Sequence, residues 1–362
     1  MTFSVELKAI LRSGVTAVPA TASGKIDSMS SSSATPDAAS AAIPHPQHLT
    51  LGIGAALGAG LMWGLVFVAP LLLPDYPATL LSFGRYFAFG LVTLPIAWWQ
   101  RKALRQLTRA DWWLATKLSI VGNFIYYLTL SAAIQLAGAP LPTLIIGTLP
   151  VVIAVVSNLG SHGEHRFSWA RLVPSLLLIA AGLLCVNADQ VARLQAEGAL
   201  TAYLGGAALA IVANAAWTWY PIHNARWLNA HRQHTSTTWA TAQGITTLPI
   251  AAVGLALSLL WLRLTGDPRF APSLSGPEPL KFWLLMTVIG FCASWLGTML
   301  WNIASKNTPT ALTGQLIVFE TLAALAYAYL VYQRSPSGFE ITGIVLLVLG
   351  VIVGVRALAS RQ

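Results

Sequence analysis

Apolar runs of about 20 residues, the length an α-helix needs to cross a bilayer, recur along this chain from residue 51 onward. The 362 residues are 56% hydrophobic and 9% charged, which a soluble domain could carry only with a large exposed apolar surface. Helices are expected, since open strands would leave backbone groups unpaired in lipid. The sequence therefore predicts an all-α integral membrane protein with ten transmembrane helices, near residues 51–72, 78–99, 112–135, 141–160, 169–187, 199–220, 237–262, 280–303, 310–332 and 339–358.

The N-terminal stretch differs in composition from the rest of the chain. Residues 25–48, KIDSMSSSSATPDAASAAIPHPQH, are rich in Ser, Ala and Pro and show no hydrophobic periodicity. Such a segment cannot bury enough apolar surface to order itself. We expect residues 1–47 to form a disordered cytoplasmic tail. The stretch lacks the apolar region of a secretory signal peptide, and Met29 is an alternative start of the chain.

The positions of Lys and Arg predict how the helices are oriented. With the N-terminus in the cytoplasm, 14 basic residues fall in cytoplasmic segments and five in external segments, while Arg85 and Lys117 lie inside predicted helices. This excess follows the positive-inside rule and predicts that both termini are cytoplasmic. The net charge of +9 is then a property of loops beside the lipid bilayer, and no nucleic-acid partner is expected.

The two halves of the chain carry similar landmarks in the same order, which indicates an internal repeat. Each half holds five predicted helices, so the second copy must enter the membrane from the opposite side. The sequence predicts two inverted five-helix repeats, at residues 51–187 and 199–358. In secondary transporters built this way, substrate binds near the midplane where the repeats meet. The matched pairs are Trp63 with Trp217, Arg85 with Gln243, Tyr127 with Trp295, and Pro140 with Pro309.

Several short motifs accompany this architecture: the tryptophans at 63 and 217, Phe-Gly-Arg-Tyr at residues 83–86 and Pro-Thr-Ala-Leu-Thr at residues 309–313. With them, the chain from about residue 51 to 358 resembles the drug/metabolite transporter superfamily, in its two-copy EamA-domain branch. Trp301-Asn302 and the helix that follows are similar to the bacterial aromatic amino acid exporters.

The resemblance implies a bacterial inner-membrane protein with a central cavity, alternating access, and coupling to a proton or to exchange. It implies neither a cofactor nor ATP hydrolysis, and the chain has no G-x-x-x-x-G-K-S/T phosphate loop.

Two polar stripes lie within predicted helices. They consist of Asn123, Tyr127, Ser131 and Gln135 in the third helix, and of Ser294, Thr298 and Asn302 in the eighth. Residues at this spacing drift slowly round one helix face, so the stripes are candidate walls of one cavity. Alternatively they join helices through hydrogen bonds, which contribute about 0.6 to 2 kcal/mol each in membranes.

Aromatic side chains are plentiful in the same helices. Rings that line a cavity can stack on an aromatic substrate or hold a cation over a face, although most aromatic residues in helices serve packing. Both interpretations stay open for each ring. The candidate substrate-binding residues are Trp63, Arg85, Asn123, Tyr126, Tyr127, Trp217, Gln243, Trp295, Trp301 and Asn302.

Glu320 lies in the middle of the predicted ninth helix. An ionisable side chain at this depth is costly, so it is a functional-site hypothesis by default. Alternatively, it is a neutral carboxyl hydrogen-bonded to a neighbouring helix. The predicted difference in membrane depth between Arg85 and Glu320 is within the reach of an arginine side chain. Either Arg85 binds a substrate carboxylate while Glu320 binds a coupling proton or an amine, or the two form a structural bridge between the halves. The exporters that the chain resembles often carry Pro near this position, so Glu320 is where its own specificity or coupling is expected.

The sequence therefore predicts a secondary active transporter that moves a small amphipathic metabolite, an amino acid or related zwitterion, outward by alternating access. Export of a cationic drug and uptake of a metabolite are the alternatives. An integral-membrane enzyme is the remote alternative: the chain has no G-x-S-x-G elbow, and residues 162–165 are too compact for an H-E-x-x-H metal motif. No metal site is expected.

Overall fold

The computed structural model describes residues 46–149, 151–152, 156, 170, 173–196, 200–231, 233–270, 273, 276–307, 316 and 318–359. The expected tail lies outside these residues, apart from its last two positions, which already belong to a helix. Met29, Pro309 and most of the second half of the predicted fourth helix also lie outside them.

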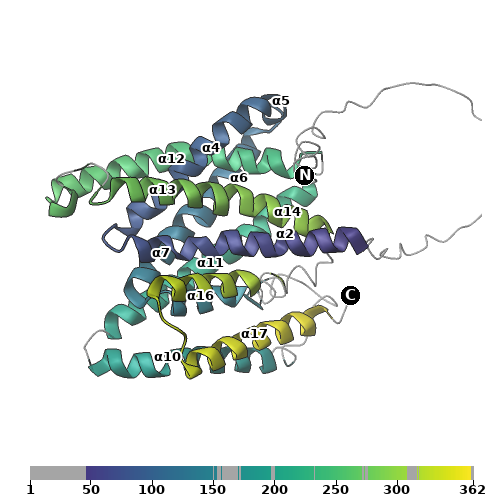
Figure 1. The fold of residues 1–362 in the computed structure, drawn as a ribbon. Coiled ribbons are helices and arrows are strands. Elements are labelled where there is room, and N and C mark those ends of the chain that lie inside the picture. The colour runs from purple at the N-terminus through teal and green to yellow at the C-terminus, as the bar shows by residue number, and fades with distance from the viewer. Residues whose placement is uncertain are drawn as a thin grey trace, which may run out of the picture. The chain divides into compact units, whose positions relative to one another are not determined.

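The described ranges contain helices and no strand. Two 3-10 turns, η1 (Leu65–Phe67) and η5 (Pro268–Phe270), accompany the α-helices. The α-helices, most of which are labelled in Figure 1, are α2 (Pro46–Gly64), α3 (Ala69–Leu72), α4 (Ala78–Trp99), α5 (Arg101–Leu104), α6 (Arg109–Leu118), α7 (Tyr126–Ala137), α8 (Pro140–Gly147), α10 (Val173–Ala196), α11 (Leu200–Ala230), α12 (Ser236–Leu264), α13 (Pro279–Ile289), α14 (Gly297–Asn307), α16 (Val318–Tyr332) and α17 (Gly338–Ala359).

Within the described residues, six helical segments are long and apolar enough to cross a membrane. Three shorter apolar helices coincide with the fifth, ninth and tenth predicted spans. The all-helical fold is confirmed, while the count of ten spans and their inverted repeat stay predictions. The six segments are Leu49–Leu72, Ala78–Trp99, Arg109–Ala137, Leu200–Asn224, Thr237–Leu264 and Pro279–Trp301, and the shorter ones are Val173–Cys185, Phe319–Tyr332 and Gly338–Gly354.

Two of these segments contain a π-helical stretch of seven residues. η2 (Ser119–Ile125) joins α6 to α7, and η6 (Gly290–Leu296) joins α13 to α14. A π-helical turn is rare and is frequently found at a functional site. Each stretch carries one member of the predicted polar stripes, Asn123 in η2 and Ser294 in η6.

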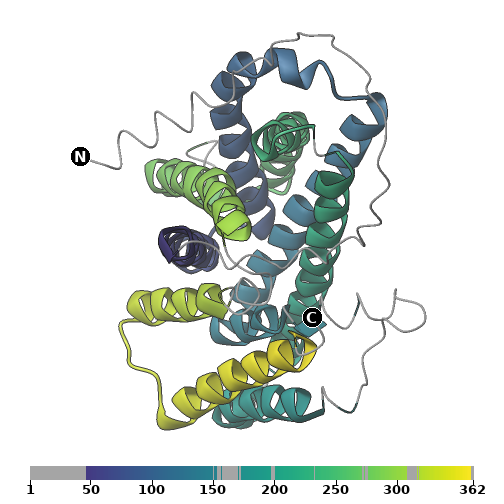
Figure 2. The same cartoon turned by 90° about the vertical axis from the view of Figure 1, so that its right-hand side faces the viewer.

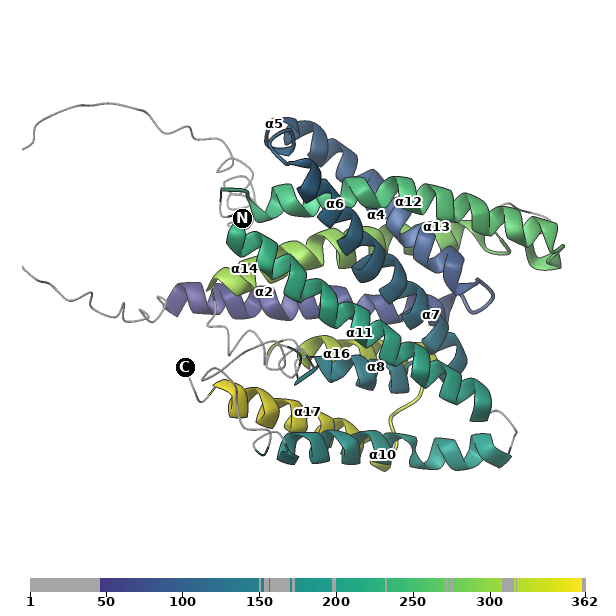
Figure 3. The same ribbon diagram turned by 180° about the vertical axis from the view of Figure 1, so that it is seen from behind.

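Helices far apart in the sequence pack along each other in pairs. α4 lies beside α12, α7 beside α11, α2 beside α14, and α10 beside α17, while α16 packs on both α2 and α8. The pair α10 and α17 lies at the foot of Figures 1 and 3, and Figure 2 shows it from another side. Each of the four pairs joins the first half of the chain to the second, so the largest apolar core draws side chains from both halves.

The helices α2 and α16 cross closely because α2 presents glycine at the contact. A Cβ atom at Gly60 would lie 3.1 Å from the backbone nitrogen of Glu320, and one at Gly64 would lie 2.9 Å from Cβ of Ala323. Small residues allow such close approach in membranes. The crossing holds the first turn of α16, which carries Glu320, against α2.

The sixth predicted span, 199–220, coincides with the apolar segment Leu200–Asn224, but the helix α11 continues beyond it to Ala230. Trp227 in the added turns is 4% exposed and stacks on Trp239, with 3.6 Å between the ring centroids. This buried contact stabilises the longer helix. His231, at the end of this helix, is partly buried and stacks on Trp227 at 4.7 Å.

Candidate functional site

Arg85 is the centre of the candidate site. Its side chain projects from α4 into the core, and the residue is 4% exposed. The guanidinium carbon lies 4.4 Å from the ring centroid of Tyr127 and 4.9 Å from that of Tyr86. Nη2 donates a hydrogen bond to Oγ of Ser294 in η6 at 3.3 Å. Nε and Nη1 are buried and have no hydrogen-bond partner among the residues that the structure describes.

Two free donors on a buried cation need an explanation. Each buried polar group without a partner costs about 1 to 3 kcal/mol, and native structures contain few of them. The two rings contribute about 0.5 to 2 kcal/mol of cation-π attraction, but they accept no hydrogen bond from Nε or Nη1. A carboxylate is the acceptor with which Arg pairs most strongly. Arg85 therefore presents two buried donors that no acceptor satisfies within the described part of the chain.

A row of aromatic rings extends beside this cluster, and we call it the aromatic row. Trp301 in α14 lies 5.3 Å from Trp63 in α2, which meets Trp217 in α11 edge-on at 6.3 Å. Trp217 lies between two stacked rings, Tyr126 at 4.7 Å and Tyr220 at 5.1 Å. Four of the predicted aromatic candidates, Trp63, Tyr126, Trp217 and Trp301, are thus brought together by helices distant in the sequence.

The polar residues at η2 are largely paired with each other. Asn123 Nδ2 donates to Thr247 Oγ1 at 3.3 Å. Gln243 Oε1 accepts a hydrogen bond from Tyr220 Oη at 2.8 Å, and Gln243 Nε2 donates to Asn224 Oδ1 at 3.0 Å. These bonds join η2, α11 and α12. They agree with the alternative interpretation of the polar stripe, in which its residues join helices through hydrogen bonds. A role of Asn123 and Gln243 in binding substrate stays a prediction.

Glu320 is 6% exposed in the first turn of α16. No described residue forms a hydrogen bond or ion pair with its carboxyl group. Tyr126 lies close enough to interact electrostatically with both Glu320 and Arg85. The two ionisable side chains therefore share one buried region, yet no direct bridge joins them in this structure.

The structure supports the roles of two other predicted site residues less directly. Trp295 in η6 stacks on Phe291 at 5.6 Å and packs against the same apolar core as Trp63 and Trp217, but no ring pair with the aromatic row is found among the described residues. Asn302 belongs to α14, but its side chain lies outside the described residues. Their predicted roles therefore rest on the sequence alone.

Sequence reasoning left three residues of this cluster out of the candidate set: Tyr86, Tyr220 and Ser294. Tyr220 follows Trp217 by three residues, a spacing that places both on one helix face. Ser294 was recognised in a polar stripe, but nothing local to the sequence indicates that it meets Arg85, 209 residues away.

No group of three or more His, Cys, Asp or Glu side chains that could hold a metal ion occurs among the described residues.

Comparison with known proteins agrees with the helical fold. Residues 50–188 match the EamA-like transporter family. The chain is 47% identical over 307 residues to the inner membrane protein YtfF of Escherichia coli, an alignment that covers 84% of this chain and 95% of that protein.

A solved crystal structure of a protein is 17% identical, with a TM-score of 0.54, over 85% of this chain and 96% of that one. This second likeness concerns the fold alone. The relative and the apolar helices together support a multi-pass location in the inner membrane. The chain thus belongs to the EamA-like transporter family of the drug/metabolite transporter superfamily.

Proposed function

We propose that this protein is a secondary active transporter that moves a small amphipathic metabolite, an amino acid or related zwitterion, outward across the inner membrane by alternating access. The observation that carries the proposal is the buried Arg85 guanidinium, whose Nε and Nη1 find no acceptor in the described ranges. The substrate carboxylate supplies that acceptor. Both termini lie in the cytoplasm in this proposal, as the distribution of Lys and Arg favours.

We further propose that the chain folds as ten transmembrane helices in two inverted repeats, residues 51–187 and 199–358. The helix contacts support it. A two-fold relation pairs the second helix with the seventh and the fifth with the tenth, as α4 packs on α12 and α10 on α17. The same relation makes the contact between the third and sixth helices equivalent to the contact between the eighth and first helices. These contacts are α7 on α11 and α14 on α2. The third and eighth helices each carry a seven-residue π-helical stretch.

In the proposed site, Arg85 and Glu320 hold opposite ends of the zwitterion. The substrate amine, or a coupling proton, binds at the buried Glu320 carboxyl. The remaining candidates contact the apolar part of the substrate or its polar edges. They are Trp63, Asn123, Tyr126, Tyr127, Trp217, Gln243, Trp295, Trp301 and Asn302. Rings suit this role because they offer large, rigid faces at low entropic cost.

A second candidate function is the export of cationic compounds. The observation that favours it is Glu320, a buried carboxyl group with no ion pair among the described residues. In this case Glu320 is the main determinant of binding and Arg85 is dispensable. Uptake in place of export uses the same site and differs only in direction.

Counterflow in proteoliposomes tests these proposals after a ligand is found by thermal shift. A panel of amino acids, nucleobases and cationic dyes suffices, because a ligand at 100 times its Kd stabilises the folded state by about 2.7 kcal/mol. Zwitterionic transport requires that Arg85→Lys and Glu320→Gln each lose most of the counterflow. A suitable control is Glu340→Gln, since Glu340 pairs with Arg334 through two bonds of 2.8 Å outside the site. Normal transport by both site variants would refute the proposal, while loss in Glu320→Gln alone would select the cation exporter.

A further inference from the structure

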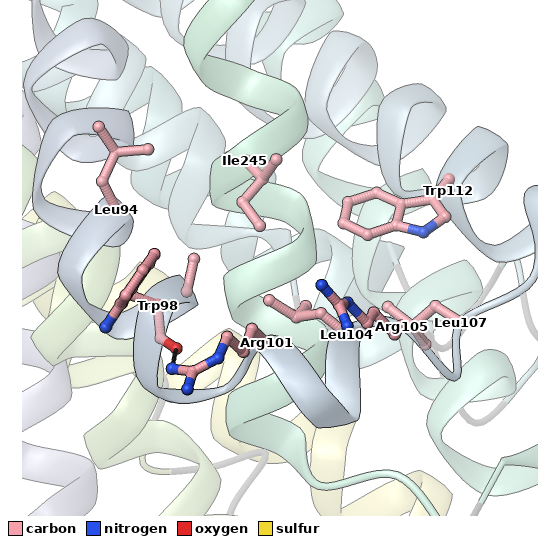
Figure 4. Close-up of a pocket in the computed structure, with 9 residues that line it drawn as sticks. Leu94, Trp98, Arg101, Leu104, Arg105, Leu107, Trp112 and Ile245 are labelled. Atoms are coloured by element: carbon pink, nitrogen blue, oxygen red, sulfur yellow. Dashed lines mark hydrogen bonds between the residues drawn. The ribbon is translucent and has the colours of Figure 1, made fainter.

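A pocket of about 580 Å³ lies where the end of α4, the helix α5 and the start of α6 meet α12 (Figure 4). This volume falls within the roughly 300 to 1,000 Å³ of small-molecule sites. Its lining includes the buried side chains of Leu104 and Leu107. Arg85 and the aromatic row do not line it.

Two arginines give this pocket its charge. Arg101 is held at the rim, because its Nη1 donates a hydrogen bond to the carbonyl oxygen of Trp98 at 3.0 Å and its guanidinium carbon lies 4.9 Å from the Trp98 ring centroid. In Figure 4, Arg101 and Arg105 lie between Trp98 on one side and Trp112 on the other. Neither arginine forms an ion pair with a described residue.

The acidic residue closest in sequence does not neutralise this charge. Asp111 is buried, and its Oδ2 accepts hydrogen bonds from the backbone nitrogen and Oγ1 of Thr108 at 2.8 and 2.7 Å. Its Oδ1 accepts a third bond from Nε1 of Trp227 at 2.7 Å. The carboxylate serves the N-terminal cap of α6 and the Trp227 contact, so the positive charge of the pocket is left for an external anion.

The opposite side of the pocket continues into a surface suited to lipid. Leu94 lines the pocket and is 47% exposed, and Leu91, one turn before it on α4, is 46% exposed. Trp98 is 68% exposed at the end of the span Ala78–Trp99. Indole rings at this position mark the boundary between headgroups and acyl chains. The pocket therefore combines two cations with an apolar wall at the membrane interface.

From this arrangement we infer that the pocket binds one anionic phospholipid. The headgroup phosphate lies against Arg101 and Arg105, and an acyl chain runs from the pocket along Leu94 and Leu91. Basic pockets between transmembrane helices recognise anionic headgroups in this way. The site is independent of the substrate and of the direction of transport.

Native mass spectrometry of the full chain in detergent tests the inference, with phosphatidylglycerol as the anionic probe and phosphatidylcholine as the zwitterionic one. The test variant is Arg101→Gln with Arg105→Gln. The control is Lys102→Gln with Arg109→Gln, which removes the same charge from the same loop but does not alter the pocket lining. Each arginine near an anionic headgroup strengthens binding about fivefold, so the test variant should raise the Kd for phosphatidylglycerol about 25-fold. The control should change it less than about fivefold.

Three results would overturn the inference. In the first, the wild-type protein binds both lipids with equal affinity. In the second, the two double variants weaken the binding of phosphatidylglycerol equally, which indicates diffuse attraction to the basic segment. In the third, soluble glycerol phosphate displaces phosphatidylglycerol at equal concentration, which makes the site one for a free phosphate. Only variants whose unfolding temperature equals that of the wild type are compared. The variant with Arg101→Lys and Arg105→Lys keeps the charge and should retain most of the binding of phosphatidylglycerol.

Discussion

Replacing Gly122 by alanine tests the packing that builds the aromatic row. The added Cβ atom would lie 2.2 Å from Cδ2, 2.6 Å from Cγ and 2.9 Å from Cβ of Tyr220. The Tyr220 ring must then turn away, and α11 must shift as well, because Cβ of Tyr220 is fixed to that helix. It loses its stack on Trp217 and the 2.8 Å hydrogen bond to Gln243.

The magnitude follows from these contacts. Overpacking costs about 1 to 3 kcal/mol, the lost hydrogen bond about 0.5 to 1.5 kcal/mol, and the lost aromatic pair about 0.5 to 1.5 kcal/mol. Alanine returns at most about 1 kcal/mol through its higher helix propensity. We expect the free energy of unfolding to fall by about 1 to 4 kcal/mol, since small shifts relieve part of the strain.

Unfolding of the purified protein in detergent provides the assay. Gly54→Ala is the matched control, because nothing lies within 4 Å of the Cβ atom added there. It should leave stability unchanged or raise it by up to about 1 kcal/mol. In a double-mutant cycle, Gly122→Ala should cost clearly less in a Tyr220→Ala background, since the ring is gone and only the 2.9 Å approach to the Cβ atom of residue 220 remains. Equal stability of Gly122→Ala and Gly54→Ala, or a cycle without coupling, would refute the proposed contact.

Three further substitutions test other parts of the structure through the same unfolding measurement. Trp227→Phe should cost about 1.5 to 3 kcal/mol, because it removes the donor to the buried Asp111 carboxylate; an unchanged midpoint would mean that this bond contributes nothing. Tyr76→Phe should cost about 0.5 to 1.5 kcal/mol, since Tyr76 Oη accepts a 2.9 Å hydrogen bond from the backbone nitrogen of Glu278, and a larger loss would point to a wider role of Tyr76 in the connection between α12 and α13. Asn214→Ala should cost about 0.6 to 2 kcal/mol, because Asn214 Nδ2 donates to the carbonyl oxygen of Ile145 at 2.6 Å and joins α11 to α8; stability equal to the wild type would exclude that link.

Several limits of the helices were predictable from the sequence. The second predicted span, 78–99, has the bounds of α4, and α8 begins at Pro140, one residue before the fourth predicted span. The reason is local: bilayer thickness sets the length of an apolar run, and Pro fits the first turn of a helix. The cost of a charge in lipid likewise singled out Arg85 and Glu320 from the residue types alone, and both are buried.

The contacts that make the candidate site could not be read from the sequence. The pairing of Arg85 with Ser294 and the position of Trp217 between Tyr126 and Tyr220 depend on how helices rotate and slide against each other. Hydrophobic periodicity shows which face of a helix is apolar, but it does not say which helix lies against it.

The end of α11 likewise depends on a tertiary contact that the local sequence does not reveal. Polar and basic residues after residue 220 predicted a loop, and helical propensity gave only a weak preference there. The burial of Trp227 against Trp239, a contact of the tertiary structure, decided for helix. The sequence by itself determined that this chain is a helical membrane protein, because lipid constrains every spanning segment separately. The tertiary structure decided which side chains share the buried region around Arg85, because that depends on contacts between segments up to 209 residues apart.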